Sequence, residues 1–189
     1  MTRNTPPVDT RSPRERILHA AHALFYGQGI RATGVDKIIE AAAVTKVTFY
    51  RHYPSKELLV MAYLEFRHER WMRWFRESLA SNLAAGASQI DSLALTLRDW
   101  FDSEDFRGCA FLNAAAEFGS THPAILKIVR EHKKDVARCL DELFESPGHA
   151  LGAPLTVAID GAIVHAQMGE STDRAIDAMR SLSHCVLDD

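Results

Sequence analysis

The chain has 189 residues, of which 47% are hydrophobic and 25% charged, enough apolar material for one sizeable core or two small ones. This composition excludes a chain that is disordered throughout, and no apolar run approaches the about 20 residues that a membrane span needs. A cytoplasmic protein with no membrane partner is therefore expected. The formal net charge of −3 is unevenly divided: residues 1–56 hold nine basic and four acidic side chains, and the remainder holds 13 and 21. Such a basic segment directs one end of a molecule towards phosphate.

The chain begins with a segment that shows no apolar period. Residues 1–11 contain prolines and small polar residues and are expected to form a flexible basic arm. Ser12 and Glu15 then have the spacing of a helix N-cap and its capping box, and apolar residues follow at intervals of three and four. The helix that starts here is predicted to end at residues 27–29, which contain two glycines.

Helices are predicted along the whole remainder of the chain. Two short ones cover residues 35–42 and 45–53, and a long one starts after Ser55 and reaches about residue 84. Five more are predicted over residues 88–103, 109–119, 123–146, 153–168 and 172–187. The sequence thus predicts an all-α fold of about nine helices, divided into an arm (1–11), a helix-turn-helix DNA-binding domain (12–56) and a helical ligand-binding and dimerisation bundle (57–189).

The segment VDKIIEAAAVTKVTFYRHYPSKELL, residues 35–59, indicates the function. A short apolar-faced helix, a tight turn at residues 42–44 and a second short helix form the geometry that lays the second helix in a DNA major groove. Val44, Val47 and Phe49 are expected to fix the crossing of the two helices. The polar and basic side chains that remain are candidate contacts to base edges and phosphates. They are Thr33, Thr45, Lys46, Thr48, Tyr50, Arg51, His52 and Lys56.

The same region carries a specific run of residues, TFYRHY at 48–53 followed by SKELL at 55–59. With the first-helix pattern and Gly29, this run makes residues 14–60 resemble the N-terminal domain of the TetR family of bacterial transcriptional regulators. RGCAFLNAAAEF, residues 107–118, is similar to a segment found in one branch of the family's C-terminal domains. The resemblance implies a homodimeric regulator, most often a repressor, that a small-molecule ligand releases from a palindromic operator. It also implies DNA contacts for the candidate residues named above.

The last two predicted helices carry apolar stripes that are expected to form the dimer interface, because a palindromic operator requires a two-fold partner. Packing of these stripes within the chain is the alternative. The candidate interface residues are Leu155, Ile159, Ala162, Ile163, Ala166, Ile176, Met179 and Leu182.

Aromatic residues gather in the middle of the chain, with a few polar residues among them. Helical bundles hold small apolar ligands in cavities of this composition, although each ring considered alone is more often part of a core. An unidentified small apolar or aromatic effector is therefore expected, with no cofactor. The candidate pocket residues are Met61, Trp71, Trp74, Phe75, Trp100, Phe111, Asn113, Glu117 and His165.

Other function classes find little support in the residues. No nucleophile-and-base arrangement accompanies Cys109, and no set of ligands stands at metal-binding spacing, so neither a catalytic nor a metal site is expected. The three cysteines are expected to be reduced thiols. The alternatives left open are a ligand-independent or activating regulator of the same fold and a redox- or metal-responsive sensor.

Overall fold

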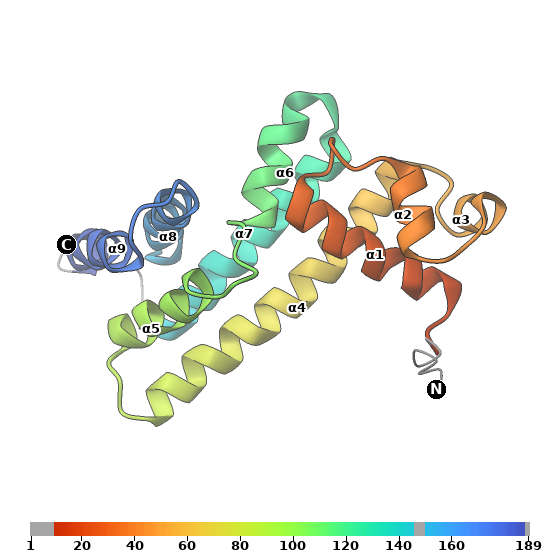
Figure 1. The fold of residues 1–189 in the computed structure, drawn as a ribbon. Helices are drawn as coiled ribbons and strands as arrows, with labels where there is room; N and C mark the ends of the chain where they lie inside the picture. Colours follow the sequence, from red (N-terminus) through yellow and green to blue (C-terminus); the bar gives the residue numbers. More distant parts are fainter. Residues whose placement is uncertain (1–9, 146–149, 188–189) are drawn as a thin grey trace, which may run out of the picture. The chain divides into compact units, whose positions relative to one another are not determined.

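The computed structural model describes residues 10–145 and 150–187 (Figure 1). Within these two ranges all regular structure is helical, which confirms the all-α prediction. The helices are α1 (Pro13–Gln28), α2 (Val35–Ala41), α3 (Lys46–His52), α4 (Lys56–Ala84), α5 (Gln89–Phe101), α6 (Ala110–Phe118), the 3₁₀ turn η1 (Gly119–Thr121), α7 (Pro123–Phe144), α8 (Gly152–Gln167) and α9 (Thr172–Leu187). The predicted arm over residues 1–11 lies almost entirely outside the described residues.

The chain divides into two compact units, Met1–Tyr63 and Leu64–Asp189. The division falls later than the expected boundary between residues 56 and 57, because the beginning of α4 packs with the first unit. The ring of Tyr63 lies 5.4 Å from that of Phe25 and 5.8 Å from that of His22, both in α1.

The first unit is built on a well-capped α1. The Ser12 side chain accepts from the Glu15 backbone N–H while Glu15 Oε2 accepts from the Ser12 backbone N–H at 2.8 Å, so the predicted capping box is confirmed. Gly29 follows the helix with φ of 88°, a conformation that favours glycine. Helices α1, α2 and α3 pack on one another around Ile17, Ile38 and Phe49, which are fully buried.

The turn between α2 and α3 is unusually tight. Ala43 adopts φ of 50°, in the left-handed region that residues with a Cβ seldom enter. The Ala43 N–H donates to the Glu40 carbonyl at 3.0 Å, and the Val44 N–H donates to the Ile39 carbonyl at 3.2 Å. The Arg16 guanidinium donates to the Ala43 carbonyl at 3.3 Å. The turn is therefore tied both to α2 and to α1.

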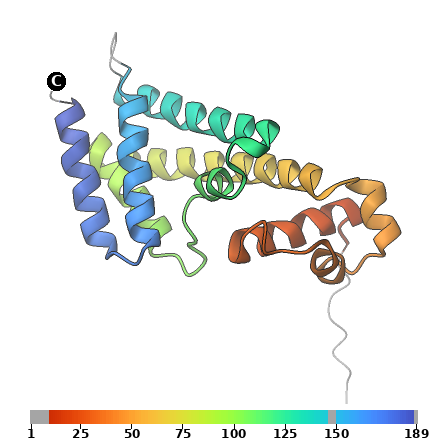
Figure 2. The same ribbon diagram turned by 90° about the horizontal axis from the view of Figure 1, so that it is seen from above.

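In the second unit α8 packs against α7 and α9, and α9 also packs against α5 (Figure 2). Helix α8 approaches α7 closely at Gly152, where a Cβ would overlap the carbonyl group of Ala137. The Gly152 N–H donates to Asp141 Oδ1 at 2.7 Å. Lys133 Nζ on α7 lies 2.5 Å from Asp160 Oδ1 on α8, so a largely buried ion pair also joins these helices.

None of the helices in the described ranges combines the length and the apolar character needed to cross a membrane.

Candidate DNA-binding and effector sites

Helix α3 is held by its cap and by one large core side chain. Thr45 is the N-cap, and its hydroxyl accepts from the Thr48 N–H at 3.1 Å and lies 2.9 Å from the Thr48 hydroxyl. Phe49 is fully buried, as predicted. The helix therefore presents the side away from Phe49 to solvent, with its orientation fixed.

The exposed side of α3 mixes polar, basic and apolar groups. Lys46, Tyr50 and Arg51 are exposed, and Lys46 has only a loose ion pair, 3.7 Å from Asp36 Oδ1 between two solvent-exposed side chains. Val47 is 79% exposed, so the expectation that it fixes the helix crossing is wrong. An exposed valine on such a helix offers methyl groups suited to the thymine methyl in a major groove. Its spacing of two from Phe49 was a signal that the two residues face opposite ways.

Three of the candidate DNA contacts, Thr33, His52 and Lys56, are less exposed than expected. Thr33 is fully buried, and its hydroxyl donates to the Gly29 carbonyl at 2.8 Å and approaches the Leu24 carbonyl at 3.3 Å. The expectation that the Thr33 side chain contacts phosphate is therefore corrected: this hydroxyl closes the C-terminal end of α1. His52 is half-buried, with a buried Nε2 that has no partner among the described residues. Lys56 is half-buried and lies over the Phe25 ring at 5.9 Å.

In the second unit, four of the predicted pocket residues form one aromatic cluster. The Trp71 ring stacks on Phe75 at 4.6 Å between centroids and meets Trp100 edge-to-face at 5.6 Å. Trp74 lies 6.0 Å from Trp71 and 6.2 Å from Trp100. Phe106, outside the predicted set, adds a ring 5.4 Å from Trp100.

His132 joins the fifth predicted ring to this cluster. It stacks on Phe111 at 3.5 Å between centroids and lies 5.3 Å from Trp71. Its Nδ1 is 3.0 Å from Nδ1 of His68, whose Nε2 lies 3.6 Å from Asp135 Oδ2. Burial, together with the nearby Lys133 and other positive groups, lowers the pKa of His132 to about 2, so the ring is neutral.

Sequence reasoning missed His132, but a signal was present. It lies at an apolar position of α7, in register with the buried Val129 and Val136. A histidine at a core position of an amphipathic helix is a group that must find a partner in the interior.

The remaining predicted pocket residues do not join the cluster. Met61 belongs to the first unit. The Asn113 amide binds the Arg107 carbonyl at 3.0 Å and the Gln167 side chain at 3.1 Å, so it fastens the start of α6 to α8. His165 is exposed and lies 3.7 Å from Glu170, so its assignment to the aromatic pocket is corrected. Glu117 is half-buried on α6.

Most of the predicted dimer residues are interior residues of this chain. Six are largely buried by the chain itself and pack in the second unit: Leu155, Ile159, Ala162, Ile163, Ile176 and Met179. Ala166 is half-buried and Leu182 is exposed. The expectation is corrected for Leu155, Ile159, Ile163 and Ile176, which pack within the chain, whereas Ala162 and Met179 line a groove between α8 and α9.

Helix α8 nevertheless has a second apolar side, which faces solvent. Val157, Gly161, Val164 and Met168 are exposed and follow one another at intervals of four, three and four residues, so they lie on one side of the helix. We call these four residues the outer stripe of α8. A helix that is apolar around its circumference is covered on more than one side in folded proteins.

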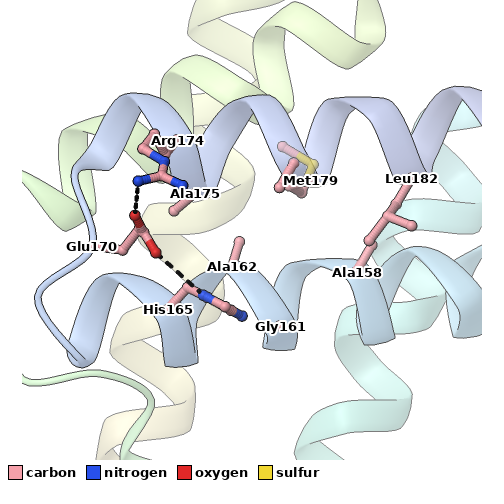
Figure 3. Close-up of a pocket in the computed structure, with 10 residues that line it drawn as sticks. Ala158, Gly161, Ala162, His165, Glu170, Arg174, Ala175, Met179 and Leu182 are labelled. Carbon is pink, nitrogen blue, oxygen red and sulfur yellow. Dashed lines mark ion pairs between the residues drawn. The ribbon is translucent and has the colours of Figure 1, made fainter.

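A groove of about 280 Å³ lies beside this stripe, between α8 and α9 (Figure 3). Small residues, among them Ala158, Gly161 and Ala178, form much of its wall. At one end Glu170 lies 3.0 Å from Arg174 as well as near His165. The groove is thus apolar along its length and charged at one end, and its small residues let another helix approach closely.

The candidate redox residue, Cys109, lies next to a positively charged side chain. Cys109 is buried, and the Lys133 ammonium donates to its sulfur at 3.6 Å. Burial lowers the pKa of Lys133, but the neighbouring Cys109 and Asp160 outweigh burial, and the pKa is raised overall. Over residues 10–145 and 150–187, no three His, Cys, Asp or Glu side chains are grouped so as to hold a metal ion.

Comparison with known proteins gives a consistent result. The family described as bacterial regulatory proteins, tetR family, matches residues 17–63. The regulator UidR of Escherichia coli strain K12 is 32% identical over 72 residues, 38% of this chain and 37% of its own length. The repressor KstR2 of Rhodococcus jostii strain RHA1 is 32% identical over 102 residues, 52% of this chain and 50% of its own. The chain thus spans about a third to a half of the length of these curated relatives.

A solved structure extends the similarity to almost the whole chain. The crystal structure of a TetR-family transcriptional regulator from Streptomyces coelicolor has 30% sequence identity and a TM-score of 0.76, and the match covers 94% of this chain and 95% of that one.

Proposed function

Because this chain belongs to the TetR family of bacterial transcriptional regulators, we propose that it is a homodimeric repressor that binds a palindromic operator and leaves it when a small aromatic or apolar effector binds the second unit. Family membership makes the chain a DNA-binding helix-turn-helix regulator and not an enzyme. Bacterial DNA lies in the cytoplasm, so the proposed site of action is the cytoplasm.

The observation that carries the proposal is the exposed side of α3. Its core residue Phe49 and the strained turn at Ala43 fix the helix, while Lys46, Val47 and Tyr50 stand in solvent. In the proposed complex the N-terminal residues Thr45, Lys46 and Thr48, together with Val47, read base edges. Tyr50, Arg51, His52 and Lys56 bind phosphate oxygens and set the register.

The dimer is proposed to form through the outer stripe of α8 and the groove beside it. A palindromic operator is read by two half-sites, so the protein needs a two-fold axis that places a second recognition helix. The exposed Val157, Val164 and Leu182 flank small residues that allow close helix packing. The second copy thus covers the side of α8 that the chain leaves in solvent.

The effector is proposed to act on the aromatic cluster of Trp71, Trp74, Phe75, Trp100 and Phe111. A ligand changes operator affinity only if it binds the DNA-competent and DNA-incompetent states with different affinities. Together with His132 on α7, these rings join α4, α5, α6 and α7, so a ligand inserted between them changes how the four helices pack. Through this change in packing, ligand binding is proposed to release the protein from DNA.

Operator binding tests the proposal. DNA flanking the gene is titrated with the wild type and with the double variant Lys46→Ala, Tyr50→Ala at two salt concentrations. Each lost contact is expected to weaken sequence-specific binding by between about 5- and 150-fold, and loss of the lysine reduces the salt dependence. Lys127→Ala, which removes one exposed positive charge from α7, is the control and leaves binding unchanged. Equal weakening by the control, or binding without sequence preference, contradicts the assignment.

The dimer is tested by sedimentation with a matched pair of variants. Val164 and Leu95 are 41% and 40% exposed, on α8 and α5 respectively. Val164→Glu buries a charge at the proposed interface and is expected to yield monomers. Leu95→Glu places the same charge at a comparable exposure elsewhere and leaves the dimer intact. A dimer that tolerates Val164→Glu contradicts the proposed interface.

A further inference from the structure

In the second unit the indole N–H of Trp71 is a buried hydrogen-bond donor that no described residue satisfies. Trp71 is 9% exposed, and its indole Nε1 is inaccessible to solvent and has no hydrogen-bond partner within the described part of the chain. The indole N–H is the only polar group of the side chain, and it can only donate. Buried tryptophans ordinarily find an acceptor, since an unmet donor in the interior destabilises the fold.

The side chains around Trp71 explain why the donor is unmet. Its ring is surrounded by Phe75, Trp74, Trp100 and His132 at centroid distances of 4.6 to 6.0 Å. Ring faces are weak acceptors of N–H groups. Trp74 and Trp100 carry only N–H donors of their own, and the His132 ring is engaged through Nδ1 with His68 and stacks on Phe111. Aromatic rings thus surround an N–H donor that has no hydrogen-bond partner among the described residues.

We propose that the effector is an uncharged aromatic compound bearing a carbonyl-type oxygen, which accepts a hydrogen bond from Trp71 Nε1 while its ring lies among the rings of the cluster. This inference rests on the proposed function, whose effector it specifies. The rings supply stacking and edge-to-face contacts to a planar ligand, and the N–H fixes its orientation. His132 is neutral, so the cluster has no formal charge of its own that would call for an ionised ligand.

The fit also explains how such a ligand would be sensed. The centroids of neighbouring rings in the cluster lie 3.5 to 6.2 Å apart, so a further ring enters only if neighbouring side chains separate. Trp71 stands on α4, Trp100 on α5 and His132 on α7. Binding therefore favours an arrangement of these helices that differs from the one adopted without ligand, which is the differential affinity that a regulator requires.

The test uses acetophenone and α-methylstyrene, which have nearly the same shape and differ by C=O against C=CH₂. Affinities of the full-length protein for both probes are measured by calorimetry in the wild type, Trp71→Phe and Trp74→Phe. The ratio of the two affinities is compared between proteins, so that the different solvation of the probes cancels. Trp71→Phe is expected to lower the preference for acetophenone by between about 5- and 150-fold. Trp74→Phe, the same ring change in the same cluster, is expected to leave it unchanged.

A second measurement observes the donor directly. In protein labelled with ¹⁵N at the indoles, the Trp71 Nε1–H resonance, assigned by its loss in Trp71→Phe, is expected to shift downfield with acetophenone and not with α-methylstyrene. An affinity ratio unaffected by Trp71→Phe, an unmoved indole resonance, or no binding of either probe at millimolar concentration overturns the inference. Operator binding by the ligand-free protein is measured in parallel: if it persists while the probes fail, the ligand class is wrong and the proposed function stands.

Discussion

In the first unit Lys46, Tyr50 and Arg51 of α3 stand in solvent, whereas in the second unit His132 and Lys133 of α7 are buried and bound to neighbouring helices. Lys46 and Tyr50 have little to restrain them, while His132 and Lys133 are enclosed with His68, Cys109 and Asp160. Exposed polar groups are suited to a partner that arrives from solvent, such as DNA. Buried ones couple helices to one another, so a change at one helix is transmitted to the next. The first unit is thus suited to contacting DNA, and the second unit is suited to responding to a ligand.

The largest effect is expected from removing the side chain that fixes α3. Phe49→Ala opens a cavity at a fully buried site and is expected to cost about 3–5 kcal/mol of the stability of the first unit, with loss of operator binding. Denaturant unfolding measures this. Val47→Ala, on the exposed side of the same helix, is the control and changes stability by less than about 0.5 kcal/mol. If the two variants were equally destabilised, α3 would not be oriented as described.

A comparable test in the second unit uses two glycines of α8. A Cβ at Gly152 overlaps the Ala137 carbonyl, so Gly152→Ala is expected to destabilise by about 1–3 kcal/mol. At Gly161 a Cβ meets no atom of the described residues within 4 Å, and Gly161→Ala is expected to stabilise the monomer by about 0.5–1 kcal/mol. Thermal unfolding distinguishes the two. A destabilised Gly161→Ala monomer would show that α8 has no solvent-facing side there.

The buried histidine predicts a pH dependence confined to the second unit. The pKa of His132 falls from 6.5 to about 2 on folding, so below pH 6.5 the unfolded chain takes up a proton that the folded chain does not. Stability is therefore expected to fall as the pH is lowered from 6.5, by at most about 1.4 kcal/mol per pH unit from this group. Urea unfolding at pH 7 and pH 5 measures it. His132→Phe is expected to reduce the change of unfolding free energy between pH 7 and pH 5, whereas His165→Asn, at an exposed site, is expected to leave it as in the wild type. The same pH dependence in both variants would refute the assignment.

The smallest effect is expected at an exposed ion pair. Arg98 Nη1 lies 2.6 Å from Asp173 Oδ1, but both side chains are accessible to solvent and Asp173 is largely exposed. Asp173→Asn is therefore expected to change stability by less than about 1 kcal/mol. Asp160→Asn, which leaves the enclosed Lys133 ammonium without its carboxylate, is expected to be the more damaging in the same unfolding measurement. A larger loss of stability in Asp173→Asn than in Asp160→Asn would mean that burial does not determine how much each ion pair contributes.

Local patterns determined much of the first unit. The capping box of Ser12 and Glu15, the short helices and the buried Phe49 follow from residue spacing within a few turns, because caps and amphipathic faces involve neighbours in sequence. The specific residues of α3 could be named for the same reason. The burial of Thr33 did not follow from such spacing, because it depends on how the loop after α1 turns back and brings the Thr33 hydroxyl to the Leu24 carbonyl.

The sequence by itself therefore determined that the described part of this chain is helical, approximately where its helices begin and end, and which short segment carries the helix-turn-helix. Only the tertiary structure decided which side of α8 faces outward, because a helix that is apolar on several sides has no periodicity that distinguishes an inner stripe from an outer one. The tertiary structure also brought His132 to Trp71 and His68, residues more than 60 positions apart, since long-range packing alone determines which helices meet. The donor left unmet at Trp71 Nε1 is a property of that packing and of no local pattern.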